Sequence, residues 1–211
     1  MLKSVDLETK LKDPSLLKKQ AYINGKWVGA KSGKTFPVYN PSTGEVIADV
    51  PDMGVEDLQV AIDGAYKAQK TWAAKTGKER AGILKKWNDL MVENADDLAI
   101  ILTAEMGKPL AEARGEIVYG ASFIEWFAEE AKRVYGETIP GHQPDKRIMV
   151  IKQPVGVVAS ITPWNFPNAM ITRKAGPALA SGCAFVAKPA GETPLSGLVM
   201  VELAERAGVP A

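Results

Sequence analysis

The last third of the chain alternates short apolar runs with helical segments, and this alternation constrains the fold more than any other feature. Val155–Ile161 and Ala184–Ala187 have the length and the composition of buried strands. Pro167–Ala180 and Pro194–Ala207 have helical length and pattern. Strands and helices that alternate at this spacing predict parallel βαβ units, so we predict an α/β fold.

Residues 20–50 alternate short β-like runs with turn signals. Asn24-Gly25 separates the runs Ala21–Ile23 and Lys26–Val28, and this dipeptide favours the tight turn of a β-hairpin. A second set of turn residues, Asn40–Gly44, comes just before the run Val46–Ala48. We expect short antiparallel strands here.

Apolar residues at helical spacing predict four helices in the middle of the chain: Val55–Ala74, Glu79–Glu93, Ala95–Glu105 and Leu110–Tyr135. Asn94 is expected to cap the third helix and Gly107 to end it. We expect no convergent polar residues among these helices, which we interpret as scaffold. A loop at Pro140–Asp145 and a strand at Arg147–Gln153 follow.

Composition excludes several classes of function. The 26 Lys and Arg residues balance 25 Asp and Glu residues, which predicts no nucleic-acid or membrane partner. One cysteine and one histidine allow neither an internal disulfide nor a metal cluster of those residues. Met1–Asp6 does not resemble a secretory signal. We predict a cytoplasmic protein, with a matrix protein freed of its transit peptide as the alternative.

The run from Ile161 to Pro167 places special residues after the first predicted parallel strand. Ligands of open parallel sheets bind at the carboxyl ends of the strands. Pro163 and Pro167 restrict the backbone on either side of Trp164-Asn165. The Asn165 amide can therefore point at a developing oxyanion, or it can cap a helix at Phe166–Ala180. The residues alone leave both readings open.

Lys188 ends the second predicted parallel strand. A lysine at the end of a buried strand is costly to leave unpaired, so it either meets a ligand or a carboxylate or extends to solvent. Cys183 enters the same strand, with no cation before it to lower its pKa. We predict that Cys183 is buried and unreactive.

Several separate motifs are similar to those of the aldehyde dehydrogenase superfamily. They are Gly25-Lys26-Trp27, Asn40-Pro41-Ser42-Thr43-Gly44, Glu105-Met106-Gly107-Lys108-Pro109, Pro163-Trp164-Asn165-Phe166-Pro167 and Lys188-Pro189-Ala190. The resemblance runs from about residue 20 to the last residue. It implies the N-terminal part of the aldehyde dehydrogenase fold, with an incomplete Rossmann-like parallel sheet flanked by helices.

The resemblance also implies a mechanism in which a cysteine thiolate attacks an aldehyde and hydride passes to a nicotinamide. A thioester remains, and water activated by a glutamate hydrolyses it. Asn165 would hold the oxyanion. The cofactor-binding residues would be Ile161, Thr162, Pro163, Trp164, Lys188, Ala190 and Gly191, with Lys188 near the adenosine ribose.

Three further runs resemble succinate-semialdehyde dehydrogenases: residues 116–119, residues 125–131 and Met170–Lys174. Arg173 would then grip the distal carboxylate of the substrate, since a guanidinium matches a carboxylate bidentately. The alternative is that Arg173 occupies the exposed face of its helix. Glutarate semialdehyde or an uncharged aldehyde is the alternative substrate.

The sequence departs from the family pattern after Lys188-Pro189-Ala190. The family often has a glutamate next, and its carboxylate accepts from the ribose hydroxyls of NAD. Here Gly191 takes that place and Glu192 is displaced by one residue. A missing carboxylate removes repulsion against a 2′-phosphate, which favours NADP, although Glu192 keeps NAD open.

The family's Glu-Leu-Gly-Gly segment and its segment bearing the nucleophilic cysteine do not occur in these residues. Gly208 and Pro210 end a helix where another strand would be expected. We therefore expect an interrupted chain that is inactive by itself. A non-catalytic nucleotide-binding or oligomerising chain is the alternative.

The predicted organisation has three parts. Residues 1–135 give the N-terminal strands and helices of the cofactor-binding domain, residues 136–152 begin an oligomerisation segment, and residues 153–211 give a truncated βαβ unit. The family suggests a homodimer or homotetramer.

Overall fold

The computed structural model describes residues 6–211. The prediction about a secretory signal depends mainly on residues 1–5, which lie outside the described residues. The strands are β1 (Ala21–Ile23), β2 (Lys26–Val28), β3 (Thr35–Tyr39), β4 (Val46–Pro51), β5 (Glu137–Pro140), β6 (Arg147–Val150), β7 (Val157–Ile161) and β8 (Ala184–Lys188). The α-helices are α1 (Val55–Ala73), α2 (Gly77–Glu93), α3 (Ala95–Met106), α4 (Leu110–Glu130), α5 (Ala169–Ala180) and α6 (Pro194–Ala207).

The βαβ unit predicted for the last third is confirmed. β7 and β8 pair in parallel, from Val157 opposite Ala184 to Ile161 opposite Lys188. α5 connects the two strands, and both α5 and α1 pack against them. The α/β fold class is therefore confirmed, with one parallel pair among the described residues.

The predicted hairpin and the predicted second turn are also confirmed. β1 pairs antiparallel with β2, and Asn24 and Gly25 in the turn have φ values of 53° and 74°. Glycine adopts this left-handed conformation without strain and asparagine tolerates it. β3 pairs antiparallel with β4, and the Asn40 N–H donates to the Glu45 carbonyl across the connecting turn.

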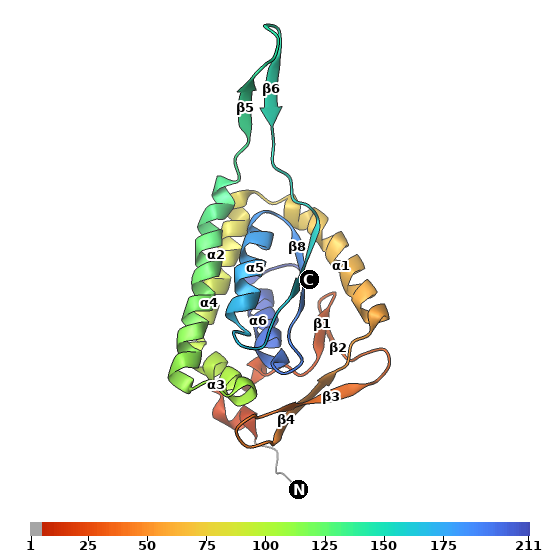
Figure 1. The fold of residues 1–211 in the computed structure, drawn as a ribbon, viewed down its shortest axis with the longest axis vertical. Helices are drawn as coiled ribbons and strands as arrows, with labels where there is room; N and C mark the ends of the chain where they lie inside the picture. Colours follow the sequence, from red (N-terminus) through yellow and green to blue (C-terminus); the bar gives the residue numbers. More distant parts are fainter. Residues whose placement is uncertain (1–5) are drawn as a thin grey trace.

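A layer of helices, α2, α3 and α4, packs on α5 and α6 (Figure 1). α4 packs against α2, α3 and α5, and α6 packs against α2 and α3. Leu84 and Met91 of α2 and Ile117 and Ile124 of α4 are all buried in the shared core. Each such side chain contributes about 1.5–3 kcal/mol when it leaves water, so this layer is a main source of stability.

Several predicted boundaries are wrong by a few residues. α4 ends at Glu130 and passes into a short 3-10 turn, Ala131–Arg133, instead of continuing to Tyr135. α5 begins at Ala169, two residues after Pro167. β6 and β7 are separated by residues 151–156, where Gly156 has a φ of 115° that breaks the extended pattern.

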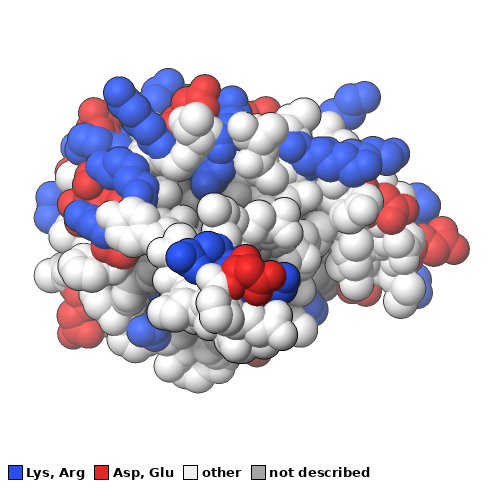
Figure 2. Space-filling model, turned by 90° about the horizontal axis from the view of Figure 1, so that it is seen from above, with Lys and Arg blue, Asp and Glu red and all other residues white. Residues whose placement is uncertain are grey.

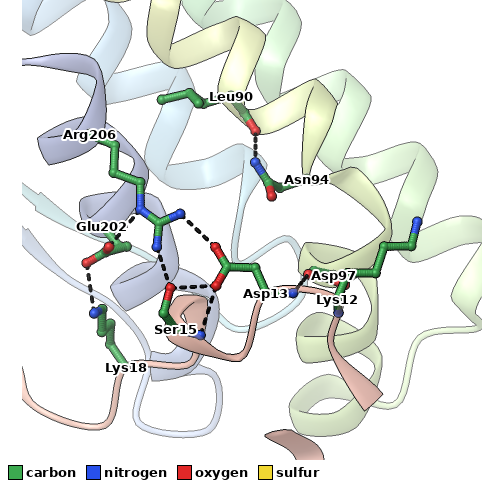
Figure 3. Close-up of polar contacts among 9 residues, drawn as sticks. All are labelled: Lys12, Asp13, Ser15, Lys18, Leu90, Asn94, Asp97, Glu202 and Arg206. Carbon is green, nitrogen blue, oxygen red and sulfur yellow. Dashed lines mark hydrogen bonds and ion pairs between the residues drawn. The ribbon is translucent and has the colours of Figure 1, made fainter. Parts of the chain in front are cut away.

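Asn94 occupies the capping position of α3, as predicted, but its side chain makes no capping hydrogen bond there. Its amide donates instead to the Leu90 carbonyl of α2 at 2.8 Å (Figure 3). The Asn94 side chain therefore helps to close α2. The prediction for Gly107 is confirmed, since this residue follows α3 with a left-handed φ of 83°.

The N-terminal segment is fastened across α6 and α3 by charged groups (Figure 3). Arg206 of α6 donates to Asp13 at 2.7 Å and to Glu202 at 2.8 Å. The carboxylate of Asp97 in α3 accepts from the backbone N–H groups of Lys12 and Asp13 at 2.9 and 2.8 Å. The first and last parts of the described chain thus lie side by side.

Two buried glutamates contradict the expectation that the middle helices carry no convergent polar residues. Glu116 of α4 accepts from the N–H groups of Asn168 and Ala169 at 3.0 and 3.3 Å, at the start of α5. Glu105 of α3 accepts from the N–H groups of Leu195 and Ser196 at 2.8 and 2.7 Å, at the start of α6. A carboxylate is favourable at such a position because the first N–H groups of a helix lack partners and carry partial positive charge.

The other end of α5 is also held, by side chains from α1 and α2. The Trp72 indole N–H donates to the Leu179 carbonyl at 2.9 Å, and Arg80 Nε donates to the Ala180 carbonyl at 3.1 Å. These donors satisfy carbonyl groups that lack partners at the end of a helix. α5 is therefore fixed at both ends by residues distant in sequence.

We predict that the stability contributed by Glu105 depends on pH. Burial raises the pKa of Glu105 from 4.5 to about 8, despite the opposing hydrogen bonds from the start of α6. Because the folded state holds the proton more tightly than the unfolded state, this contribution is complete below about pH 4.5 and is lost as pH rises through 8. Glu105→Gln cannot titrate. The unfolding free energy of the wild type relative to this variant should fall between pH 5 and pH 8, by up to about 1.4 kcal/mol per pH unit.

Urea unfolding followed by circular dichroism at pH 5, 6, 7 and 8 measures this difference. Glu202→Gln, which alters a less buried carboxylate, is the matched control. A difference that stays constant or increases with pH would contradict the assignment.

Candidate functional site

The carboxyl ends of the two parallel strands form one edge, as expected from the sequence. Ile161 at the end of β7 lies opposite Lys188 at the end of β8. The Thr162 N–H continues the pairing by donating to the Lys188 carbonyl at 3.3 Å. The segments 162–165 and 189–191 therefore leave the sheet side by side, and we call them the strand-end loops.

Asn165 lies in the first strand-end loop with its side chain exposed and without a hydrogen bond to the described part of the chain. The alternative in which Asn165 caps the next helix is wrong, because Asn168 occupies the capping position of α5. The N–H groups there are satisfied by Glu116 instead. The Asn165 amide is thus available as a donor at the edge of the sheet.

Lys108 holds the backbone of this loop from the connection between α3 and α4. Its ammonium donates to the Asn165 carbonyl at 3.1 Å and lies 3.9 Å from the centre of the Phe166 ring. The same ammonium pairs with Glu116 Oε2. The Lys108 and Glu116 side chains are 10% and 1% exposed, so the ion pair is largely desolvated. Removing one member of such a pair typically costs about 3–5 kcal/mol because the other charge is left buried.

Sequence reasoning missed the contacts of Lys108, Glu116 and Glu105. One signal was present: Glu116 and Glu105 each fall at a buried position of a helix, among apolar residues at helical spacing. A carboxylate at such a position needs a partner. The sequence does not show which partner, because Glu116 and Asn168 are 52 residues apart.

Lys188 is not a buried lysine, although it ends a strand of the parallel pair. Its residue is exposed, and its side chain makes no hydrogen bond or ion pair with residues 6–211. The reading in which Lys188 extends to solvent fits the structure. An exposed ammonium at the strand edge remains free to contact a ligand that binds there.

The remaining candidates for cofactor contact surround the same edge. Ile161 is 77% exposed and Trp164 is 52% exposed, so two large apolar side chains face solvent there. The buried hydroxyl groups of Thr162 and Thr193 have no hydrogen-bond partner within the described residues. Gly191 is exposed, and a Cβ added to it would approach only Phe36, at 3.8 Å. The edge thus combines exposed apolar surface with unused polar groups, as a ligand site requires.

Arg173 lies on the exposed side of α5, with its guanidinium 5.0 Å from the centre of the Phe123 ring. It forms no ion pair within residues 6–211. Arg173 therefore lies on α5, the helix that begins shortly after Asn165. Its position on the helix surface is compatible with both readings of its role.

Cys183 is 3% exposed, as predicted. It precedes the first residue of β8, whereas Asn165 follows the last residue of β7. A strand of this length spans about 16 Å at 3.3 Å per residue, so Cys183 lies far from the strand-end loops. Arg80 packs beside Gly182, so a cation does approach this region from α2, which the sequence did not show.

A basic hollow lies at the other end of the parallel strands. Its lining includes Lys75, Lys78, Arg80, Lys132 and Lys152, with Pro154 and Ser181 near the amino ends of β7 and β8. Lys and Arg gather on the face of the molecule from which the β5–β6 hairpin projects (Figure 2). This hollow is separate from the strand-end loops.

No helix among residues 6–211 has the length and apolar character needed to cross a membrane. The same residues contain no cluster of three or more His, Cys, Asp or Glu side chains that could hold a metal ion.

Comparison with known proteins identifies the class of this protein. Residues 27–211 match the aldehyde dehydrogenase family, so the chain belongs to that family. The family membership expected from the motifs is confirmed.

The relatives that this chain resembles include semialdehyde dehydrogenases. It is 65% identical over 201 residues to the glutarate-semialdehyde dehydrogenase of Pseudomonas putida, covering 95% of this chain and 42% of the relative. It is 61% identical over 202 residues to the succinate-semialdehyde dehydrogenase [NADP(+)] GabD of Escherichia coli, covering 96% and 42%. The solved succinate-semialdehyde dehydrogenase of Burkholderia pseudomallei matches with a TM-score of 0.93 at 61% identity, covering 95% and 42%. The chain thus spans less than half the length of these relatives.

Proposed function

We propose that Asn165 supplies the oxyanion donor of an NAD(P)-dependent aldehyde dehydrogenase, and that the other residues at the edge of the parallel strands supply the adenosine-side cofactor contacts. The proposed reaction oxidises succinate semialdehyde to succinate. The observation that carries the proposal is the pairing of Ile161 with Lys188, which brings both strand-end loops to one edge. The family membership and the unused Asn165 amide support it.

Asn165 is proposed to donate its side-chain N–H to the oxyanion that forms when a thiolate adds to the aldehyde. Lys108 holds the backbone of Asn165, and the Asn165 side chain makes no hydrogen bond within the described chain. The side-chain N–H is therefore free to bind an oxyanion. Preorganised donors of this kind typically contribute about 3–4 kcal/mol to transition-state stabilisation. The nucleophilic thiolate and the general base come from residues outside the 211, since buried Cys183 lies at the opposite end of β8.

The strand edge fits a dinucleotide. Ile161 and Trp164 offer apolar surface, the Thr162 and Thr193 hydroxyl groups are buried without partners in the described chain, and Lys188 offers an exposed cation. Thr162, Pro163, Trp164, Lys188, Ala190 and Gly191 would hold the cofactor, whose nicotinamide accepts hydride. We propose NADP over NAD, because Gly191 places no carboxylate where a 2′-phosphate would bind.

The substrate is proposed to carry a carboxylate at the end opposite to the aldehyde. Arg173 is exposed, lacks an ion pair within the described chain and lies on the helix that follows Asn165. Succinate and glutarate semialdehydes both have this second carboxylate. Glutarate semialdehyde is the second candidate, favoured by the 65% identity to the Pseudomonas putida enzyme.

The β5–β6 hairpin is proposed as the start of an oligomerisation segment, within the three-part division of residues 1–135, 136–152 and 153–211. Both strands are exposed along their whole length, and Ile139 and Ile148 face each other in the register with 40% and 39% of their surfaces exposed. Exposed apolar strands favour association. We propose a homodimer or homotetramer, located in the cytoplasm.

A chimera tests the proposed activity. Residues 1–211 would replace the matching segment of the Escherichia coli relative, which would supply the rest of the enzyme. We expect the chimera to reduce NADP with succinate semialdehyde, at a kcat/KM higher than with NAD, and the 211-residue chain alone to give no turnover. The measurement is the absorbance of the reduced cofactor at 340 nm. A folded but inactive chimera, or steady turnover by the isolated chain, would contradict the proposal.

Arg173→Ala in this chimera tests the substrate class. We expect the KM for succinate semialdehyde to rise about tenfold or more, because one charge-assisted interaction with the carboxylate is lost. The KM for propanal, which has no carboxylate, should change less than about twofold. Lys174→Ala, on the next residue of α5, is the matched control. Equal changes for both aldehydes would show that Arg173 does not contact the carboxylate.

A further inference from the structure

The loop that carries Asn165 is attached to the helical layer at two points, and both attachments involve one ion pair. Lys108 Nζ donates to the Asn165 carbonyl at 3.1 Å. Glu116 Oε1 accepts from the N–H groups of Asn168 and Ala169, three and four residues further along. The ion pair between Lys108 Nζ and Glu116 Oε2 joins these two attachments to each other.

The Lys108 ammonium also lies over the face of the Phe166 ring, 3.9 Å from its centre. A cation at this distance interacts favourably with an aromatic ring. The contacts of Lys108 and Glu116 therefore reach Asn165, Phe166, Asn168 and Ala169. The Asn165 side chain is left out of this network and stays exposed.

Burial makes the geometry of this network restrictive. The Glu116 side chain is 1% exposed and the Lys108 side chain 10% exposed, so water cannot replace a lost partner easily. Pro109 directly follows Lys108 and restricts the backbone from which the Lys108 side chain extends. The network thus restrains the backbone of Asn165, although Asn165 itself lies at the surface.

We infer that Lys108 and Glu116 are positioning residues for the Asn165 oxyanion donor. The inference rests on the proposed function and deepens it. Lys108 and Glu116 touch neither the substrate nor the cofactor in this account. They act on the transition state only through the orientation of Asn165, because a small displacement of a catalytic donor can cost about 100-fold in rate.

The test is a double-mutant cycle in the chimera, with kcat and the KM for NADP measured for each variant. We expect Lys108→Met and Glu116→Gln each to lower kcat by about 10-fold to 100-fold while the KM for NADP changes less than about twofold. Asn165→Ala should lower kcat by about 100-fold or more. In the Asn165→Ala background, Lys108→Met and Glu116→Gln should lower kcat by less than about threefold, because the donor that they orient is gone.

Lys132→Met and Glu129→Gln are matched controls, since they break an exposed lysine–glutamate pair on the surface. These controls should leave kcat unchanged. Thermal unfolding establishes that each variant is folded, and Glu116→Gln carries the cycle if Lys108→Met does not fold.

The outcomes separate the inference from the proposed function. If Lys108→Met and Glu116→Gln lower kcat by the same factor in the Asn165→Ala background as in the otherwise unmodified chimera, the inference is overturned, since the losses would reflect a general structural role. Lys108→Met and Glu116→Gln with unchanged kcat would overturn it too. An Asn165→Ala variant with unchanged kcat would instead overturn the proposed role of Asn165.

Discussion

Two buried glutamates hold the starts of the helices that follow the two parallel strands. Glu116 and Glu105 leave the helical layer and accept backbone N–H groups at the starts of α5 and α6, the helices that follow β7 and β8. The first N–H groups of a helix have no partner within that helix, so a buried start needs an acceptor from elsewhere. The layer of α3 and α4 supplies both acceptors and thereby fixes the helix starts that follow the strand-end loops.

The candidate site depends on this arrangement more than on its own residues. Asn165 and Lys188 lie at the edge because β7 and β8 are parallel and in register. Their side chains are exposed and unengaged within the described chain, so their surroundings do not restrain them. What restrains Asn165 is its backbone, held through Lys108 and Glu116. A rigid backbone with a free amide is suited to stabilise charge that develops only during a reaction.

Much of the fold could be predicted from the sequence, because local patterns determine it. The Asn24-Gly25 turn, the helical periods and the strand–helix–strand alternation each act over a few residues, and the structure confirms them. The edge position of Asn165 and Lys188 followed from the parallel strands. The partners of Glu105, Glu116 and Arg80 could not be predicted, because each contact joins residues 52 to 100 positions apart. The contact of Asn94 with Leu90 is local, but helical periodicity does not show which carbonyl a side-chain amide binds.

Amide hydrogen exchange at single-residue resolution tests whether Glu116 and Glu105 hold the starts of α5 and α6. We expect slow exchange at Asn168, Ala169, Leu195 and Ser196 in the wild-type chain, since all four N–H groups are bound by buried glutamate side chains. Glu116→Ala should accelerate exchange at Asn168 and Ala169 while leaving Leu195 and Ser196 protected, and Glu105→Ala should do the reverse. Fast exchange at these amides in the wild type, or equal acceleration at both helices in either variant, would contradict the claim that each carboxylate fastens its own helix.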